Sequence, residues 1–172
     1  MDLRTFAAYL VSKHGDIKGK KAFQKLVYLA KAEGIPFNHA YRLHYYGPYS
    51  DAVAKELDAI LEQRILTVSS NSYLYKKGEN VDKIETESIK EIKQYKKHLE
   101  RLLERFGNMS PSELEIYATA HFVYRNQVVF ERPVDRETVI NEIKKAKYPK
   151  FTEAQINEAY DNLIFWNLIN TQ

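Results

Sequence analysis

The densest positive charge in this 172-residue sequence lies between residues 13 and 31, where six lysines accompany a single aspartate. Lys21 and Lys25 are one helical turn apart, so a helix would place them on one face with Gln24 and Tyr28. Lysine ammonium groups attract nucleic-acid phosphates, and a tyrosine ring offers a surface on which a base can stack. The pattern predicts a nucleic-acid contact made of Lys18, Lys20, Lys21, Gln24, Lys25 and Tyr28. An ordinary solvated helix face is the alternative, because surface lysines need no partner.

A group of tyrosines surrounds a Gly-Pro pair shortly downstream. Gly47 and Pro48 predict a sharp turn, and Ser50 predicts the N-cap of a following helix, because its hydroxyl can accept an unpaired backbone N–H. Tyrosine is enriched at protein interfaces, where it buries area and keeps a polar tip. We therefore predict a turn and contact surface formed by Tyr45, Tyr46, Gly47, Pro48, Tyr49 and Ser50. Turn and cap chemistry alone would also explain this motif.

No catalytic constellation is recognisable in the sequence. There are no cysteines, which excludes thiol nucleophiles, disulfides and zinc–thiolate sites. The five histidines form no His-x-x-x-His pair, and no Gly-rich phosphate loop or nucleophile elbow is present. We expect no enzymatic activity, no metal site and no cofactor. His121, near Tyr117 and Arg125, is expected to be a half-buried, hydrogen-bonded histidine rather than an acid–base group.

The elements that must position these residues are mainly helical. Apolar spacing predicts a helix from Leu3 that ends near Gly15, a second over 20–33, a brief strand over 42–46 and a third helix over 50–63. Residues 65–68 and 73–76 flank a Ser-Ser-Asn-Ser turn, which predicts a hairpin. Helix, helix, strand, helix and hairpin follow each other in winged-helix order, so residues 1–80 are predicted to form a winged-helix-like domain.

A helical second half is predicted beyond this domain. Residues 81–107 are expected to form a long connecting helix, and residues 108–172 a helical domain packed on the first. Ser110, Pro111 and Glu113 carry the signature of a capping box, and Thr152 with Gln155 carries another. Six apolar positions of the third and last helices align at one offset, so a second, degenerate winged-helix-like unit is one interpretation of this half. Their shared helical period is the alternative explanation.

The charge distribution argues against conventional groove reading. The third helix, from Ser50 to Arg64, has a net charge of −2, and no lysine or arginine occurs between Phe151 and Gln172. Such helices would be repelled by duplex phosphates. A second basic stretch, from Arg125 to Lys150, holds seven cationic against four acidic side chains. A nucleic acid is therefore expected on the basic second helix rather than on the acidic third helix.

The absence of cysteine, of a signal-like N-terminus and of a long apolar run favours a soluble, cytoplasmic protein without a membrane partner. The net charge of +3 permits nucleic-acid contact without arguing for it.

Two sequence segments resemble a known family. Lys20-Lys21-Ala22-Phe23-Gln24-Lys25-Leu26-Val27-Tyr28-Leu29, followed by His44-Tyr45-Tyr46-Gly47-Pro48-Tyr49-Ser50, is similar to the uncharacterised YwgA-type family of bacteria and archaea over roughly residues 18–66. The same pattern resembles, more distantly, the Panacea antitoxin domain, whose members neutralise toxins by direct binding, although Tyr49 replaces the usual small apolar residue. The resemblance implies a winged-helix-related fold without an established enzyme activity.

These observations lead to two functional hypotheses. The first is a non-enzymatic regulatory or interaction protein of winged-helix type, antitoxin-like or transcription-related, which acts through protein contacts and pairs with itself as a homodimer along the long helix. The second is a nucleic-acid-binding protein that uses the basic second helix. The salt dependence of nucleic-acid binding discriminates between them.

Overall fold

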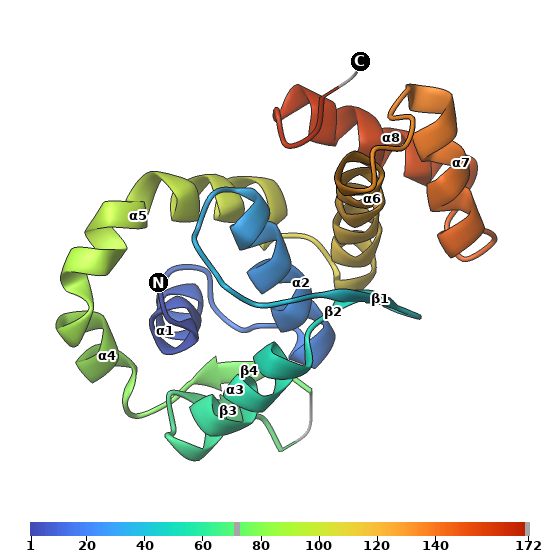
Figure 1. Ribbon diagram of the computed structural model, residues 1–172. Coiled ribbons are helices and arrows are strands. Elements are labelled where there is room, and N and C mark those ends of the chain that lie inside the picture. Colours follow the sequence, from blue (N-terminus) through green and yellow to red (C-terminus); the bar gives the residue numbers. More distant parts are fainter. Residues whose placement is uncertain (71–72, 171–172) are drawn as a thin grey trace.

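The computed structural model describes residues 1–70 and 73–170, which are mainly helical with two small antiparallel hairpins (Figure 1). This fold class agrees with the sequence-based prediction. The elements are α1 (Leu3–Lys13), α2 (Gly19–Ala32), β1 (Arg42–His44), β2 (Gly47–Tyr49), α3 (Asp51–Glu62), β3 (Leu66–Val68), β4 (Tyr75–Lys77), α4 (Val81–Glu87), α5 (Ile89–Leu102), the π-helical turn η1 (Leu103–Gly107), α6 (Pro111–Val129), α7 (Arg136–Lys147) and α8 (Glu153–Phe165).

The N-terminal helices enclose an apolar core. Leu3, Phe6 and Leu10 recur at helical spacing on α1 and are completely or almost completely buried. The ring of Phe6 meets that of Phe37 edge to face, with 5.3 Å between centroids. Helix α3 packs on α1 from one side, and α4 and α5 curve around the outside of α1 (Figure 1). This arrangement leaves α2 in the centre of the molecule.

The first hairpin corrects the predicted turn. Strand β1 pairs with β2 so that His44 faces Gly47, which places the turn at Tyr45 and Tyr46 rather than at Gly47 and Pro48. Gly47 has a φ of +85° and closes the turn as its left-handed residue. A Cβ at this position would lie 2.6 Å from Thr119 Oγ1, so glycine also allows α6 to approach the hairpin.

The second hairpin, β3–β4, forms where the sequence predicted it, with Val68 facing Tyr75. An isolated bridge from Ile17 to Tyr75 ties it to the segment before α2. Of the predicted Ser-Ser-Asn-Ser turn, Asn71 and Ser72 lie outside the described residues.

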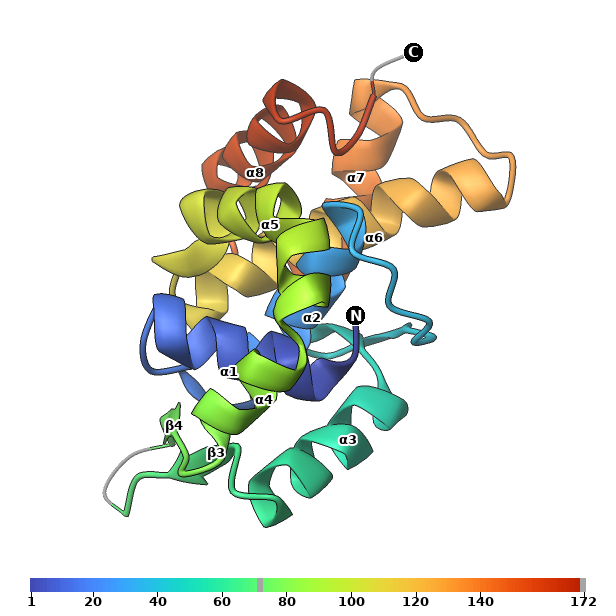
Figure 2. The ribbon, with the colours of Figure 1, turned by 90° about the vertical axis from the view of Figure 1, so that its left-hand side faces the viewer.

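The expected continuous helix over 81–107 is interrupted. Helix α4 ends at Glu87, and the backbone leaves the helical region at the C-cap residue Ser88. The Thr5 hydroxyl donates to the Ser88 hydroxyl at 2.8 Å. Helix α5 then begins at Ile89 and widens into η1 at Leu103. The interruption lets α4 pack on α1 while α5 packs on α2 (Figure 2).

The C-terminal half is built around α6. Both predicted capping boxes are present, at Ser110 with Glu113 and at Thr152 with Gln155. Helices α7 and α8 pack on α6 and on each other, away from α2 (Figure 1). When α3 and α8 are aligned by their apolar positions, Arg64 also aligns with Asn167. Both residues have a left-handed backbone conformation just past the end of their helix.

Helices α2 and α6 form the contact between the two halves. Lys21 meets Glu115, and one to two turns farther along both helices Tyr28 meets His121, so the helices run side by side in the same direction. Within residues 1–70 and 73–170, no helix combines the length and apolar character needed to cross a bilayer.

Candidate functional site

A single buried carboxylate gathers lysines from three elements. Glu115 lies in the second turn of α6, and its side chain is fully buried. Lys147, at the end of α7, donates to Oε1 at 2.7 Å, and Lys150 approaches both oxygens at 2.8 Å. Lys21 of α2 pairs with Oε2. We call these residues, together with the neighbouring Lys25, the lysine cluster.

Lys25 is the most deeply buried of the four lysines, with 1% of its surface exposed. Its ammonium group donates to the carbonyl oxygen of Pro48 in β2 at 2.6 Å. Burial lowers the pKa of Lys25 to about 7, Glu115 opposes this effect, and the charges of Lys147 and Lys21 reinforce it. Near neutral pH this side chain therefore changes its charge readily.

Hydrogen bonds within the cluster oppose the effect of burial on Glu115 and Lys147. Burial raises the pKa of Glu115, but hydrogen bonds from Lys147, Lys150 and Lys21 together lower it below its usual value. Burial lowers the pKa of Lys147, and its hydrogen bond to Glu115 partly opposes this. Among the described residues, three lysines pair with Glu115, which leaves a formal excess of +2, and Lys25 adds a further positive charge when it is protonated.

The turn between β1 and β2 covers the cluster. Lys147 donates to the carbonyl oxygen of Tyr45 at 2.7 Å. The ammonium of Lys150 lies 4.6 Å from the centre of the Tyr46 ring, and that of Lys21 lies 5.1 Å from it. Yet Tyr45 remains 72% exposed and Tyr46 49% exposed. The turn thus presents two aromatic rings to solvent directly over a group of cations.

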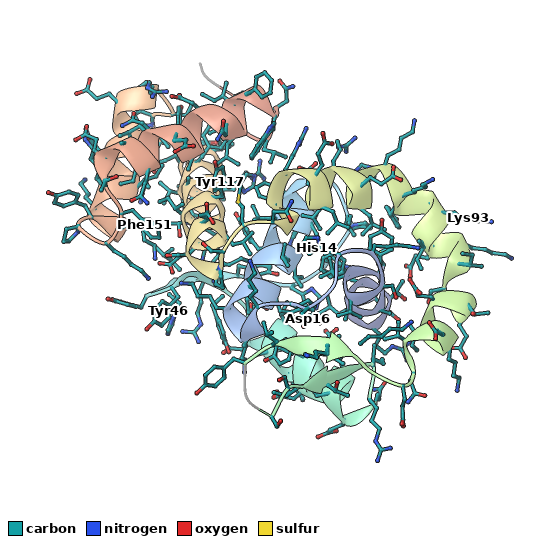
Figure 3. All side chains as sticks on the ribbon, turned by 180° about the vertical axis from the view of Figure 1, so that it is seen from behind. His14, Asp16, Tyr46, Lys93, Tyr117 and Phe151 are labelled. Carbon is teal, nitrogen blue, oxygen red and sulfur yellow. The ribbon has the colours of Figure 1, made fainter. Side chains whose placement is uncertain are left out.

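A small cavity opens beside the turn. It has a volume of about 190 Å³ and is lined by the stems of α2 lysines and by hairpin aromatics, including Lys20, Lys21, Lys25, His44, Tyr46 and Tyr49. In Figure 3, Tyr46 lies on the same side of the molecule as Phe151, which follows Lys150, whereas Lys93 lies on the opposite side. The exposed rings beside this recess can stack on a planar group.

The structure separates the six residues predicted on the basic face of α2. Lys18 and Lys20 are exposed and Lys21 is half-buried. Gln24, Lys25 and Tyr28 are buried, which corrects the expectation that they face solvent with the lysines. The physical reason is that α2 is covered on one side by the N-terminal core and on the other by α6 and the first hairpin.

The buried members of this set have internal partners. The Gln24 amide donates to the carbonyl of Ser50 at 2.8 Å and accepts from its N–H at 3.1 Å, which fixes the start of α3. The Tyr28 hydroxyl lies 2.8 Å from Nδ1 of His121. Burial and the nearby charge of Arg125 lower the pKa of His121 to about 4, so this histidine is neutral at pH 7.

The residues predicted as a turn and contact surface also divide. Tyr45 and Tyr46 are exposed and Tyr49 is half-buried, whereas Gly47, Pro48 and Ser50 are buried. Ser50 caps α3 as predicted, since its hydroxyl accepts from the N–H of Val53 at 3.3 Å.

Sequence reasoning missed Glu115 as the centre of the site. Lys147 and Lys150 belong to the second basic stretch, but nothing local showed that they meet Lys21. The one available signal was a single carboxylate within the apolar run 114–118 of a helix with a strong capping box. A buried acid in that context requires cationic partners.

Comparison with known proteins gives one partial similarity. No family model matches the chain. Over 49 residues, the chain is 39% identical to the uncharacterized protein YwgA of Bacillus subtilis (strain 168). The match covers 28% of this chain and 30% of that protein, so it supports a YwgA-like segment and extends to less than a third of either protein.

Proposed function

We propose that this chain is a non-enzymatic binding protein that contacts the phosphates of single-stranded nucleic acid through the lysine cluster and the exposed tyrosines above it. The observation that carries this proposal is the combination of three lysines paired with one carboxylate, a fourth lysine beside them, and two solvent-exposed rings at the same place. Phosphate is the natural counterion for the excess charge, and every base has a face that can stack on tyrosine.

The arrangement favours unpaired bases over a duplex. In a duplex the base faces are already stacked, whereas a single strand can place them against Tyr45 and Tyr46. The two rings meet edge to face, with 4.9 Å between centroids, and both are exposed to solvent, so a base can approach them.

The negative charge of α3 also argues against binding of a duplex by this helix. Asp51, Glu56, Asp58 and Glu62 are all exposed on α3. A winged-helix protein that read the major groove with its third helix would carry these carboxylates toward phosphates. In the proposed function the winged-helix-like half serves as a scaffold, and the first hairpin rather than α3 provides the contact.

The test is fluorescence anisotropy with a labelled oligothymidylate of about 15 nucleotides, a length that spans one typical single-strand site. The double variant Tyr45→Ala/Tyr46→Ala should weaken binding by about 10-fold or more, because stacking contributes roughly 1–3 kcal/mol per base. Lys18 and Lys20 lie outside the lysine cluster, at the exposed start of α2 next to Lys21, and the double charge reversal Lys18→Glu/Lys20→Glu should weaken binding and reduce its dependence on salt. Both pairs are on the surface, so the fold should persist.

The matched control is Lys93→Glu/Lys97→Glu, which reverses the same number of charges on the exposed face of α5, on the opposite side of the molecule (Figure 3). If this control weakens binding as much as Lys18→Glu/Lys20→Glu, the interaction depends on net charge alone and the proposed site is wrong. No anisotropy change at low salt would also reject the proposal.

A second candidate function is protein contact through the same hairpin, in an interaction protein or regulator. It is favoured by the apolar character of the hairpin surface, where Leu43 is 44% exposed beside Tyr45 and Tyr46. Pull-down from the native host discriminates between the candidates. A protein that co-purifies with the wild type but not with Tyr45→Ala/Tyr46→Ala, in the absence of oligonucleotide binding, would favour protein contact.

A further inference from the structure

A second, larger cavity has no role in the proposed function. It has a volume of about 550 Å³ and lies between α2, the segment 39–41, α6 and Leu168. This is the size range of small-molecule sites. Its walls include Tyr28, Lys31, Tyr41, His121, Phe122 and Arg125.

Aromatic rings form one wall of the cavity. Tyr28 meets Tyr41 edge to face with 5.0 Å between centroids, and Phe122 lies 6.1 Å from Tyr28. The Tyr28 hydroxyl is held by His121 at 2.8 Å, which fixes the orientation of this ring. Such a wall suits a planar, apolar body.

Two cations stand at the rim. Lys31 donates to the carbonyl of His39 at 2.9 Å and keeps two further N–H donors. Arg125 is exposed, and within residues 1–70 and 73–170 it forms no ion pair or side-chain hydrogen bond. A planar guanidinium with free donors suits a carboxylate or another oxyanion.

Two buried polar atoms at the cavity lack a partner. Neither Tyr41 Oη nor His39 Nδ1 has a hydrogen bond within the described residues, although both atoms are inaccessible to solvent. Nε2 of His39 is held by Glu56 at 2.9 Å, so the ring orientation is fixed. Leaving such atoms unpaired costs roughly 1–3 kcal/mol each.

We propose that this cavity binds a small aromatic anion, with its planar body against Tyr28, Tyr41 and Phe122 and its anionic group on Arg125 and Lys31. The site is separate from the lysine cluster. Lys31 follows Lys21 by ten residues on α2, which corresponds to about 15 Å along the helix. The two sites therefore occupy opposite ends of the α2–α6 contact.

The probe for this proposal is 8-anilinonaphthalene-1-sulfonate, an aromatic anion whose fluorescence rises in an apolar site. We expect saturable binding of one probe per chain. Arg125→Gln should weaken binding by about 10-fold, the effect of losing one charge-assisted contact. Ala40→Trp should abolish it, because Ala40 is an exposed wall residue and the new ring would fill the cavity without entering the core.

Matched controls separate this site from other surfaces. N-phenyl-1-naphthylamine, which lacks the sulfonate, should bind wild type and Arg125→Gln equally. Arg132→Gln, which removes a nearby exposed arginine outside the cavity, should leave binding of the anionic probe unchanged. Tyr45→Ala/Tyr46→Ala should also leave it unchanged, so failure of the proposed nucleic-acid function would not affect this result.

The proposal is wrong if Ala40→Trp or Arg125→Gln binds the anionic probe as tightly as the wild type. It is also wrong if neither this probe nor the smaller anion salicylate binds. Binding of salicylate is measured by the shift that it causes in the thermal unfolding midpoint.

Discussion

Among the described residues, two buried glutamates have cationic partners, and they differ in the kind and number of those partners. Glu115 is surrounded by lysines from α2, α7 and the α7–α8 connection. Glu33, at the end of α2, is bound instead by two arginines of α5 and η1. The carboxylates of both glutamates are almost completely buried.

The Glu33 pairs use both carboxylate oxygens. Arg105 donates to Oε1 at 2.7 Å and Arg101 to Oε2 at 3.3 Å. Nδ1 of His98 lies 2.6 Å from the backbone oxygen of Glu33, and the Arg105 guanidinium also lies over the Trp166 ring. With one cation for each oxygen, this cluster is an internal clamp that holds α5 and η1 against α2.

The lysine cluster has more positive charge than its carboxylate can balance. Ammonium groups are compact charges with three donors each, so Lys21, Lys147 and Lys150 keep donors beyond those used on Glu115. Burial of a charge network therefore does not by itself identify its role. The two arginines leave a formal excess of +1 at Glu33, whereas the three paired lysines leave +2 at Glu115, next to Lys25 and to two exposed rings, which suits a ligand.

The largest expected effect is that of Glu115→Gln. Removing the one carboxylate leaves Lys147 buried without a counterion, and breaking a buried pair costs roughly 3–5 kcal/mol. Urea unfolding should show this loss in chloride buffer. Phosphate at the same ionic strength should restore part of the free energy of unfolding, because a bound anion can take the place of the carboxylate.

Glu33→Gln is the matched variant for this comparison. Its arginines are 42% and 19% exposed, so water solvates them and the loss should be smaller, roughly 1–3 kcal/mol. Phosphate should stabilise this variant no more than it stabilises the wild type. Equal recovery of the two variants in phosphate would show that the lysine cluster has no special affinity for anions.

The uncharged Tyr28–His121 contact on the same helix pair gives the next largest effect. Because the pKa of His121 is lowered from 6.5 to about 4 in the folded chain, the unfolded chain binds a proton first as pH falls. The contribution of His121 to the free energy of unfolding is therefore fully present above pH 6.5. As the pH falls from 6.5 to about 4, this contribution is lost and the free energy of unfolding decreases by roughly 3 kcal/mol. His121→Gln should remove this part of the acid sensitivity in urea titrations at several pH values.

The lowered pKa of Lys25 predicts how the free energy of unfolding depends on pH above 7. Its folded pKa of about 7 lies below its ordinary value of 10.5, so between these values the unfolded chain carries a proton that the folded chain lacks. The free energy of unfolding should therefore rise with pH above 7. Lys25→Met should reduce this slope by about 1 kcal/mol per pH unit, whereas the exposed Lys93→Met should leave it unchanged. An identical slope in the two variants would contradict the assigned pKa.

The smallest effect is expected for a carboxylate at the surface. Asp161 of α8 pairs with Arg136 of α7, and both side chains are about half exposed. Asp161→Asn should change the free energy of unfolding by less than about 1 kcal/mol, and high salt should reduce the difference further. A loss as large as that of Glu33→Gln would show that burial is not what distinguishes these carboxylates.

Helix positions and their caps could be predicted from sequence because they depend on neighbouring residues. Ser50, Ser110 and Thr152 cap the helices that their spacing indicated, and the capping partners lie three residues away. The first hairpin was placed less well. Gly47 was expected inside the turn, but the turn is formed by Tyr45 and Tyr46. Gly47 follows them, and its left-handed conformation closes the turn.

The candidate site could be predicted only in part. Lys21 and the exposed Tyr45 and Tyr46 were identified from charge and aromatic content. The burial of Gln24 and Lys25 could not be, because it depends on α6 and the hairpin covering a face of α2 that the helical pattern alone leaves open.

By itself the sequence determined a mainly helical chain without cysteine, the capped helix starts and an excess of lysine near α2, since these follow from composition and from interactions within about four residues. Only the tertiary structure decided that lysines 21, 147 and 150 meet at Glu115 and that residues 28 and 121 pair beside a cavity. The reason is that these partners are between 32 and 94 positions apart or separated by whole helices, and long-range contacts of this kind are set by how complete apolar faces pack together.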